Sequence, residues 1–126
     1  MTKDDRKRID EALHRAEAGT SSRIAVRIVP DTTLDAFERA KAEFLAGGMH
    51  AHPGANAALI LVAPKARTFA VLGDRALHER VGQPFWDGIV EQMTTAFKTS
   101  TPTDAIVLGI DRLGDALHEH FTQAAP

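Results

Sequence analysis

The spacing of apolar residues predicts a helix followed by a strand at the start of the chain. Residues 3–18 carry apolar side chains at the three- and four-residue intervals of an amphipathic helix, and Gly19 follows where a C-terminal cap is expected. The predicted buried stripe is Ile9, Ala12, Leu13 and Ala16. Residues 23–29 instead carry isoleucine or valine at every second position, which is typical of a strand near a sheet edge.

A second amphipathic helix is expected after this strand. Thr32 or Thr33 is a suitable N-cap, Asp35 lies near the positive end of the helix dipole, and the glycines at 47–48 end the helix. Its predicted buried stripe is Leu34, Phe37, Phe44 and Leu45. The following loop, residues 49–56, is long for a simple connection and rich in side chains suited to chemistry.

The middle of the chain predicts a β-hairpin. Residues 57–63 are apolar throughout, which is typical of a central strand buried on both faces. Residues 64–67 form a short polar turn, and residues 68–72 return as the antiparallel partner. The first strand, the second helix and the buried strand then make a βαβ unit whose strands are parallel.

Three helices are expected after the hairpin. Asp74 is a suitable N-cap for a short helix over residues 75–81, and Pro84 favours the first turn of a longer one. Thr101, followed by a proline and then an acid, predicts the start of the last helix. The inner faces of the two long helices carry Phe85, Ile89, Met93 and Phe97, then Ile106, Ile110, Leu113, Leu117 and Phe121.

These elements predict an α/β fold: a three-layer α/β/α sandwich with a small central mixed sheet of three to four strands flanked by helices. The length of 126 residues suits a single domain over residues 1–126. A net charge of −2 gives no general attraction to nucleic acid, and the absence of cysteine excludes disulfides and thiolate sites. Residues 1–8 are too charged for a signal peptide, and no apolar run is long enough to span a membrane. We therefore expect a cytoplasmic chain without a nucleic-acid partner.

Strand direction brings polar residues together at one end of this sheet. The starts of the two parallel strands lie beside the end of the antiparallel third strand. We expect that end to gather Ser21, Ser22, His50, His52, Asn56, Asp74, Arg75, His78, Trp86 and Asp87.

Two kinds of metal site are compatible with these residues. Asp74, Asp87 and Glu79, with backbone carbonyls, suit a hard cation such as Ca²⁺ or Mg²⁺. Histidines 50, 52 and 78 with Asp74 suit a transition metal instead. With a cation present, Arg75 could donate to phosphate oxygens. His50, Asn56, Arg75, His78 and Trp86 are the candidate ligand or cleft residues.

Each of these residues also has a structural interpretation. Asp74 is a helix cap, and Asp87 is an acid favoured by the dipole in the first turn of a helix. His50 and His52 are typical solvated loop residues. Trp86 belongs to the core or to the rim of a cleft.

The order and spacing of several short motifs resemble the TPM domain family, in its short bacterial branch. The similarity spans residues 9–121, and its most specific part is the Gly-Asp…His…Gly…Phe-Trp run over residues 73–86. Further matches are Ala16-Glu17, Thr20-Ser21, Ile24, Phe44, Met49-His50, Asn56, Leu59-Ile60, Ala70-Val71-Leu72, Leu77, Val81, Met93, Phe97 and Gly109-Ile110.

The resemblance implies an α/β/α sandwich with a mixed sheet, and Ca²⁺ or Mg²⁺ binding. It also implies the acid-phosphatase activity attributed to plant relatives in the thylakoid lumen that are linked to photosystem II repair. Our leading hypothesis is a small soluble module that binds a divalent cation or a partner protein at the Asp74 end without strong catalysis. The alternative is a metal-dependent acid phosphatase that uses Asp74 and Asp87.

Overall fold

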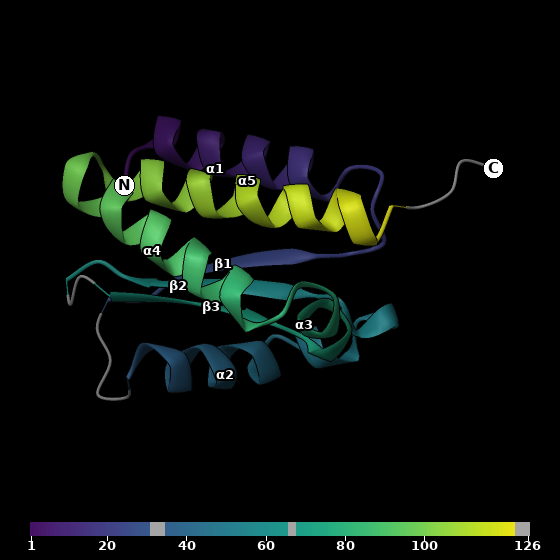
Figure 1. Cartoon of the computed structure of the whole chain (residues 1–126). Coiled ribbons are helices and arrows are strands. Elements are labelled where there is room, and N and C mark those ends of the chain that lie inside the picture. Colours follow the sequence, from purple (N-terminus) through teal and green to yellow (C-terminus); the bar gives the residue numbers. More distant parts are fainter. Residues whose placement is uncertain (31–34, 66–67, 123–126) are drawn as a thin grey trace.

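The computed structural model is a three-layer α/β/α sandwich, and it describes residues 1–30, 35–65 and 68–122 (Figure 1). In chain order, its elements are α1 (Lys3–Glu17), β1 (Ile24–Ile28), α2 (Ala36–Ala46), η1 (Met49–Ala51), η2 (Pro53–Ala55), β2 (Ala58–Ala63), β3 (Thr68–Gly73), α3 (Arg75–Val81), α4 (Gln83–Thr99) and α5 (Pro102–His120). The expected fold class is confirmed, with three strands in the described sheet.

The sheet has the order β1-β2-β3, with β2 parallel to β1 and antiparallel to β3. The register aligns Ile24 with Ala58 and Ala58 with Gly73, so the starts of β1 and β2 meet the end of β3. The predicted parallel pair and the predicted hairpin are therefore both confirmed. β1 lies at the sheet edge, as its alternating pattern indicated.

The central strand β2 divides two hydrophobic cores between the two faces of the sheet. All six of its residues are buried, as its continuous apolar sequence predicts. Ala58, Ile60 and Val62 face the core beneath α1, α4 and α5, which lie together on one side. The intervening residues face the smaller core under α2, which covers the other side alone (Figure 1).

The helix α2 corrects part of the predicted buried stripe. Phe44 is buried, but Phe37 is 48% exposed and Leu45 is 59% exposed. Because α2 has no neighbouring helix on its side of the sheet, only the narrow face carrying Ala40 and Phe44 is covered. Its N-cap is Asp35, whose side chain accepts the Glu38 N–H. The proposed caps Thr32 and Thr33, like Leu34, lie outside the described residues.

The remaining helices begin at the predicted capping and helix-start residues. Asp74 caps α3, Gly82 separates α3 from α4, and the Thr101 hydroxyl accepts the Asp104 N–H at the start of α5. The predicted loop over residues 49–56 instead contains the short 3₁₀ helices η1 and η2. Ile28, expected on the apolar face of its strand, is 45% exposed because β1 ends beyond the cover of the helices.

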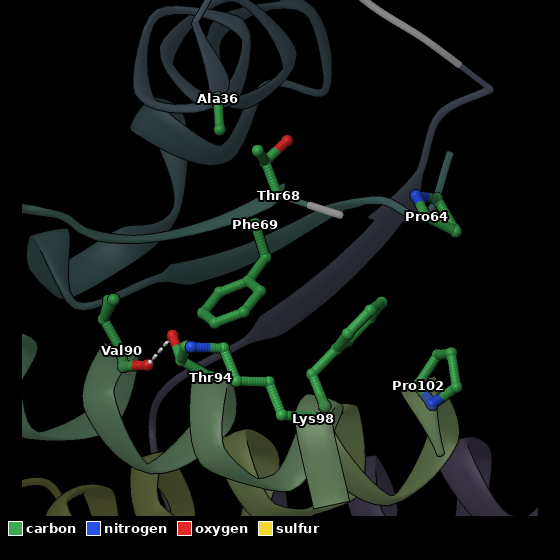
Figure 2. Close-up of a pocket in the computed structure, with 9 residues that line it drawn as sticks. Ala36, Pro64, Thr68, Phe69, Val90, Thr94, Lys98 and Pro102 are labelled. Carbon is green, nitrogen blue, oxygen red and sulfur yellow. Dashed lines mark hydrogen bonds between the residues drawn. The ribbon is translucent and has the colours of Figure 1, made fainter. Parts of the chain in front are cut away.

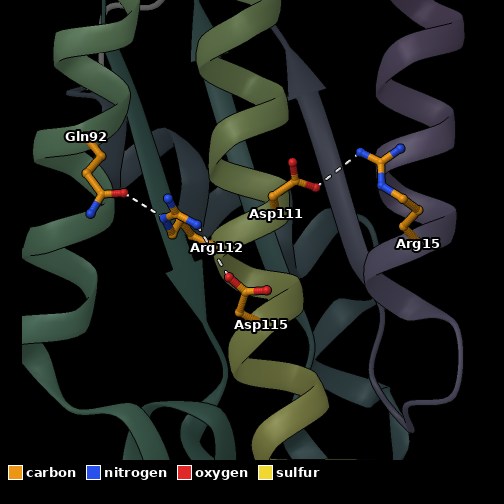
Figure 3. Close-up of polar contacts among 5 residues, drawn as sticks. All are labelled: Arg15, Gln92, Asp111, Arg112 and Asp115. Carbon is orange, nitrogen blue, oxygen red and sulfur yellow. Dashed lines mark hydrogen bonds and ion pairs between the residues drawn. The ribbon is translucent and has the colours of Figure 1, made fainter.

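Ion pairs cross the outer surface of the helical layer (Figure 3). Arg15 of α1 pairs with Asp111 of α5 at 3.2 Å, and Arg112 donates to Gln92 of α4 at 2.9 Å. Arg112 also approaches Asp115 at 3.4 Å. These side chains are largely solvated, so each pair stabilises the fold by at most about 1 kcal/mol. The helices are held mainly by the apolar residues beneath them.

Candidate functional site

The strand register places the predicted polar groups at one end of the sheet. Residues 21–22 precede β1, residues 49–56 precede β2, and Asp74 follows β3. Figure 1 shows α3 at this same end, close to the segment between α2 and β2. The Asp74 N–H donates to Ala57 O at 2.9 Å, which extends the β2–β3 pairing into this region.

Asn56 lies at the centre of a small hydrogen-bonded group. Its Nδ2 donates to Ser21 Oγ at 2.9 Å, and its carbonyl accepts the Ser22 hydroxyl at 2.5 Å. His52 Nε2 lies 2.8 Å from the Ser21 carbonyl, so this nitrogen must carry the proton. Asn56 is only 1% exposed, and its Oδ1 has no hydrogen-bond partner among the described residues. A buried acceptor without a donor is costly, so this oxygen is a candidate ligand atom.

The backbone leading to Asn56 is conformationally strained. Gly54 has φ +85° and Ala55 has φ +52°, so a left-handed glycine is followed by a left-handed alanine. The alanine conformation costs about 1–2 kcal/mol and persists only where its surroundings hold it. The hydrogen bonds of His52 and Asn56 flank this turn and hold it in place.

Asp74 is the helix cap that its sequence position indicated. One carboxylate oxygen accepts the Arg75 N–H at 2.8 Å, and the Asp74 carbonyl accepts from His78 N. The carboxylate is partly exposed, and its other oxygen has no hydrogen-bond partner among the described residues. Asp74 therefore has both its structural role and an oxygen available to a ligand.

His78 and Trp86 form a contact between α3 and α4. Trp86 Nε1 donates to His78 Nδ1 at 2.9 Å, and the indole ring is 6% exposed. Trp86 also meets Phe85 edge to face at 5.2 Å between ring centroids. The tryptophan belongs to the core, and His78 closes its polar edge.

The other predicted ligands do not join these groups. His50, Arg75, Glu79 and Asp87 are exposed, and Asp87 Oδ1 accepts a hydrogen bond from Gln83 at 3.0 Å. Within residues 1–30, 35–65 and 68–122, no group of three or more histidine, aspartate or glutamate side chains is arranged to hold a metal ion. The metal site remains a prediction.

The two ends of the sheet also differ in the cavities they border. A cavity of about 340 Å³ near the candidate site is lined by Phe37, Val71, Leu72, Gly73, His78, Gln83 and Trp86. A larger cavity of about 750 Å³ lies at the opposite end, between α2, β3 and α4 (Figure 2). Its wall residues come from several separate elements, so no single stretch of sequence indicates it.

Sequence reasoning also missed two polar contacts. His118 Nε2 lies 2.8 Å from Ala18 O and ties α5 to the end of α1. Gln83, the first residue of α4, lines the smaller cavity and donates a hydrogen bond to Asp87. Neither contact has a local sequence signal, except that Gln83 precedes Asp87 by one helical turn.

Known structures share this fold. The NMR structure of the BA42 protein from the psychrophilic bacterium Bizionia argentinensis has 31% sequence identity and a TM-score of 0.90, covering 98% of this chain and 86% of that one. The N-terminal domain of cg2496 from Corynebacterium glutamicum has 14% identity and a TM-score of 0.75, covering 98% and 78%. The N-terminal domain of a P. gingivalis protein has 12% identity and a TM-score of 0.82, covering 99% and 83%.

No helix in the described parts of the chain is both long and apolar enough to cross a membrane.

Two sequence comparisons gave different outcomes. A search of curated proteins found no match. The family model of the TPM domain matches residues 1–116. The chain therefore belongs to the TPM domain family.

Proposed function

We propose that this TPM domain is a binding module without strong catalysis, and that the Asp74 end of its sheet binds Ca²⁺ or Mg²⁺. The observation that supports the cation is the buried Asn56 Oδ1, which has no donor in the described parts of the chain and lies next to the strand pair that Asp74 extends. Hard cations prefer oxygen ligands, including carboxylates, amide carbonyls and water. Asp87 and Glu79 add negative charge at this end, and water completes the coordination.

The hydrogen bonds at this end support a binding role over a reaction centre. The Ser22 hydroxyl donates a hydrogen bond to the Asn56 carbonyl, and His52 Nε2 is hydrogen-bonded to the Ser21 carbonyl. His78 Nδ1 accepts from the buried Trp86. A strong nucleophile or general base needs its reactive atom free and aligned with a partner group. These side chains instead hold the end of the sheet together.

A titration of the ¹⁵N-labelled chain with CaCl₂ and MgCl₂ tests the cation site. We expect amide shifts centred on residues 54–57 and 74–79 at millimolar metal. Asp74→Asn should weaken binding at least about tenfold while preserving the fold, because asparagine is an equally good N-cap. Asp10→Asn, an exposed position on α1 with no side-chain partner in the described residues, is the matched control. Unchanged spectra at millimolar Ca²⁺ and Mg²⁺ would refute the site.

Hydrolysis of a chromogenic phosphate monoester tests the alternative, a metal-dependent acid phosphatase at Asp74 and Asp87. The binding-module proposal predicts no turnover above that of a mock purification, with or without Mg²⁺. Turnover that Asp74→Ala abolishes and Asp10→Asn preserves would establish the phosphatase instead. The cytoplasmic location and the absence of a nucleic-acid partner remain predictions from the sequence.

A further inference from the structure

Along β3, at one edge of the sheet, the outward backbone groups have no strand partner among the described residues. In an antiparallel pair, successive residues alternately face the partner strand and face away from it. The Asp74 N–H donates to Ala57 O, so every second residue before Asp74 also faces β2. The N–H and C=O groups of Phe69, Val71 and Gly73 therefore point outward, since β3 is the last strand of the sheet.

The other edge, along β1, carries charged side chains that contact two of its outward backbone groups. Ile24 and Val26 face away from β2, because Ala58 donates to the carbonyl just before Ile24. The Glu17 carboxylate accepts the outward Ile24 N–H at 2.9 Å, and the Arg27 guanidinium donates to the Val26 carbonyl at 3.3 Å. Charged groups on an edge strand prevent pairing with another chain. Among the described residues, no side chain makes an equivalent contact with the outward groups of β3.

Walls on both sides turn the open β3 edge into a groove. At the Thr68 end, Ala36 of α2 and Val90 and Thr94 of α4 face each other across β3 around the 750 Å³ cavity (Figure 2). The floor and inner wall there are mostly apolar and include the Phe69 ring. The groove is thus lined by groups that prefer contact with apolar side chains, and Val71 at its centre is only 6% exposed.

The same groove has a second cavity at its Gly73 end. Phe37 of α2 and Trp86 of α4 border that cavity, with Val71 and Gly73 of β3 between them. The exposed side chains of Phe37 and Val90 stand on opposite walls of the groove. A six-residue strand is roughly 20 Å long, so the two cavities lie along a length suited to a short extended peptide.

We propose that β3 accepts an extended peptide segment of a partner protein as an added antiparallel strand. Its backbone pairs with Phe69, Val71 and Gly73, and alternate apolar side chains enter the two cavities. Lys98 lines the cavity at the Thr68 end, so an acidic residue or a C-terminal carboxylate belongs at that end of the peptide. Because β3 begins at Thr68, a peptide whose C-terminus lies there runs antiparallel to β3.

The walls favour a single peptide over a second copy of this chain. Two copies joined edge to edge through β3 would each bring α2 and α4 toward the other. The exposed side chains on the groove walls, such as Phe37 and Val90, would then contact those of the other copy before the two β3 backbones could pair. A lone strand has no flanking layers, so it reaches the β3 backbone between those walls.

Amide exchange in the presence of a peptide probe tests the added strand on the unmodified protein. The probe is a short N-acetylated peptide of alternating valine and threonine that ends in aspartate, added to the ¹⁵N-labelled chain. At ten times Kd, the outward amides of Phe69, Val71 and Gly73 should exchange about tenfold more slowly, since only the free fraction exchanges. The amides of Ala70 and Leu72, which already face β2, are the internal control.

N-methylation of the probe separates strand pairing from non-specific contact. Methyl groups on one set of alternate peptide nitrogens should abolish binding, because those nitrogens donate to β3. Methyl groups on the other set should have little effect, because those nitrogens face solvent. Equal loss or equal retention with both sets would overturn the added strand.

Charge reversal tests the direction of the peptide. Lys98→Glu should raise the Kd of the aspartate-ended probe roughly threefold to tenfold and should favour the same probe ending in lysine. Lys7→Glu, on α1 outside the groove, should change neither affinity. An effect of the same size in both variants would reduce the charge preference to net charge alone and overturn the assigned direction.

Two further results would overturn the proposal as a whole. One is the absence of shifts at millimolar probe. The other is self-association of the free chain in sedimentation, with shifts at the outward β3 amides, which would assign the groove to a second copy. The cation titration reports on a different set of amides, so failure of either proposal leaves the other testable.

Discussion

Gly73 is the residue at which close packing leaves least room for a side chain. A Cβ placed there would lie 2.5 Å from two atoms of the Trp86 indole and 3.2 Å from Leu77. Both neighbours are buried, and the indole is fixed by its hydrogen bond to His78. The glycine thus lets the end of β3 approach α4 closely.

Gly73→Ala should lower the free energy of unfolding by about 1–3 kcal/mol, because the rigid indole must shift to admit the methyl group. Gly88→Ala is the matched control. Nothing lies within 4 Å of a Cβ at Gly88, which is inside α4, so alanine there should stabilise by roughly 0.5–1 kcal/mol. Urea unfolding measures both changes, and equal midpoints for the two variants would contradict the packing explanation.

At this scale, local roles were predictable from sequence and tertiary contacts were not. Asp74 and Thr101 were identified as helix caps because such positions depend on neighbours within one turn. The burial of Asn56 was not, since it depends on residues 21–22, more than thirty positions earlier. The bond from Trp86 to His78 likewise depends on the angle between two helices.

At the scale of elements, the Asp104 carboxylate links the start of α5 to α1. Asp104 accepts a hydrogen bond from Ser100 and another from Arg8 of α1 at 2.8 Å. The Ser100 hydroxyl, followed by the Arg8 guanidinium, lowers the pKa of Asp104 below its ordinary value of 3.8. The negatively charged form is therefore favoured in the folded state.

This lowered pKa predicts an acid-sensitive contribution to stability. A folded-state pKa below the unfolded value adds stability above the unfolded pKa, which is lost as the pH falls through the folded pKa. Asp104→Asn should therefore unfold at a lower urea concentration near neutral pH and approach the parent chain as the pH falls below the lowered pKa of Asp104. When Ser100→Ala is present in both the parent chain and Asp104→Asn, the difference in their stabilities near neutral pH should shrink more than when Arg8→Met is present in both. A constant difference between the parent chain and Asp104→Asn at all pH values would contradict this assignment.

Elements with strong periodicity were predicted well, whereas exposure on α2 was not. The apolar run of β2 is buried throughout, and the centres of the α4 and α5 stripes are buried as predicted. Phe85, Phe97 and Phe121, at the ends of those stripes, are only half-buried. Phe37 and Leu45 have the same spacing but stay exposed, because burial also requires a neighbouring element on that side. Periodicity reports which face is apolar, and topology decides how much of that face is covered.

At the scale of the molecule, β2 joins two cores that would otherwise be separate. Ile60 belongs to the core under the three long helices, and Leu61 belongs to the core under α2. Both residues are fully buried. Because adjacent residues of one strand serve both cores, loss of packing on one face weakens the strand that supports the other.

Ile60→Ala and Leu61→Ala should each lower the free energy of unfolding by about 2–5 kcal/mol. Both variants should retain one cooperative transition, monitored by far-UV circular dichroism and by Trp86 fluorescence. Trp86 lies on the Ile60 side of the sheet, so it reports only that core directly. A Leu61→Ala transition in which α2 unfolds before the fluorescence changes would show that the cores are independent.

The sequence alone determined the elements, the layer architecture and the polar end of the sheet. Those features follow from short-range patterns: apolar periodicity, helix caps, and the parallel and antiparallel directions that connections impose. It also carried the TPM resemblance over residues 73–86, which the family match supports.

Only the tertiary structure decided how those elements use their surfaces. Three features arise from residues distant in the chain: the charged contacts on the β1 edge, the cavities along the β3 edge, and the Asn56 Oδ1, which has no donor among the described residues. Each depends on the relative placement of three or more elements. A pattern within one element cannot encode that placement, because the same side chain is buried or exposed according to its neighbours.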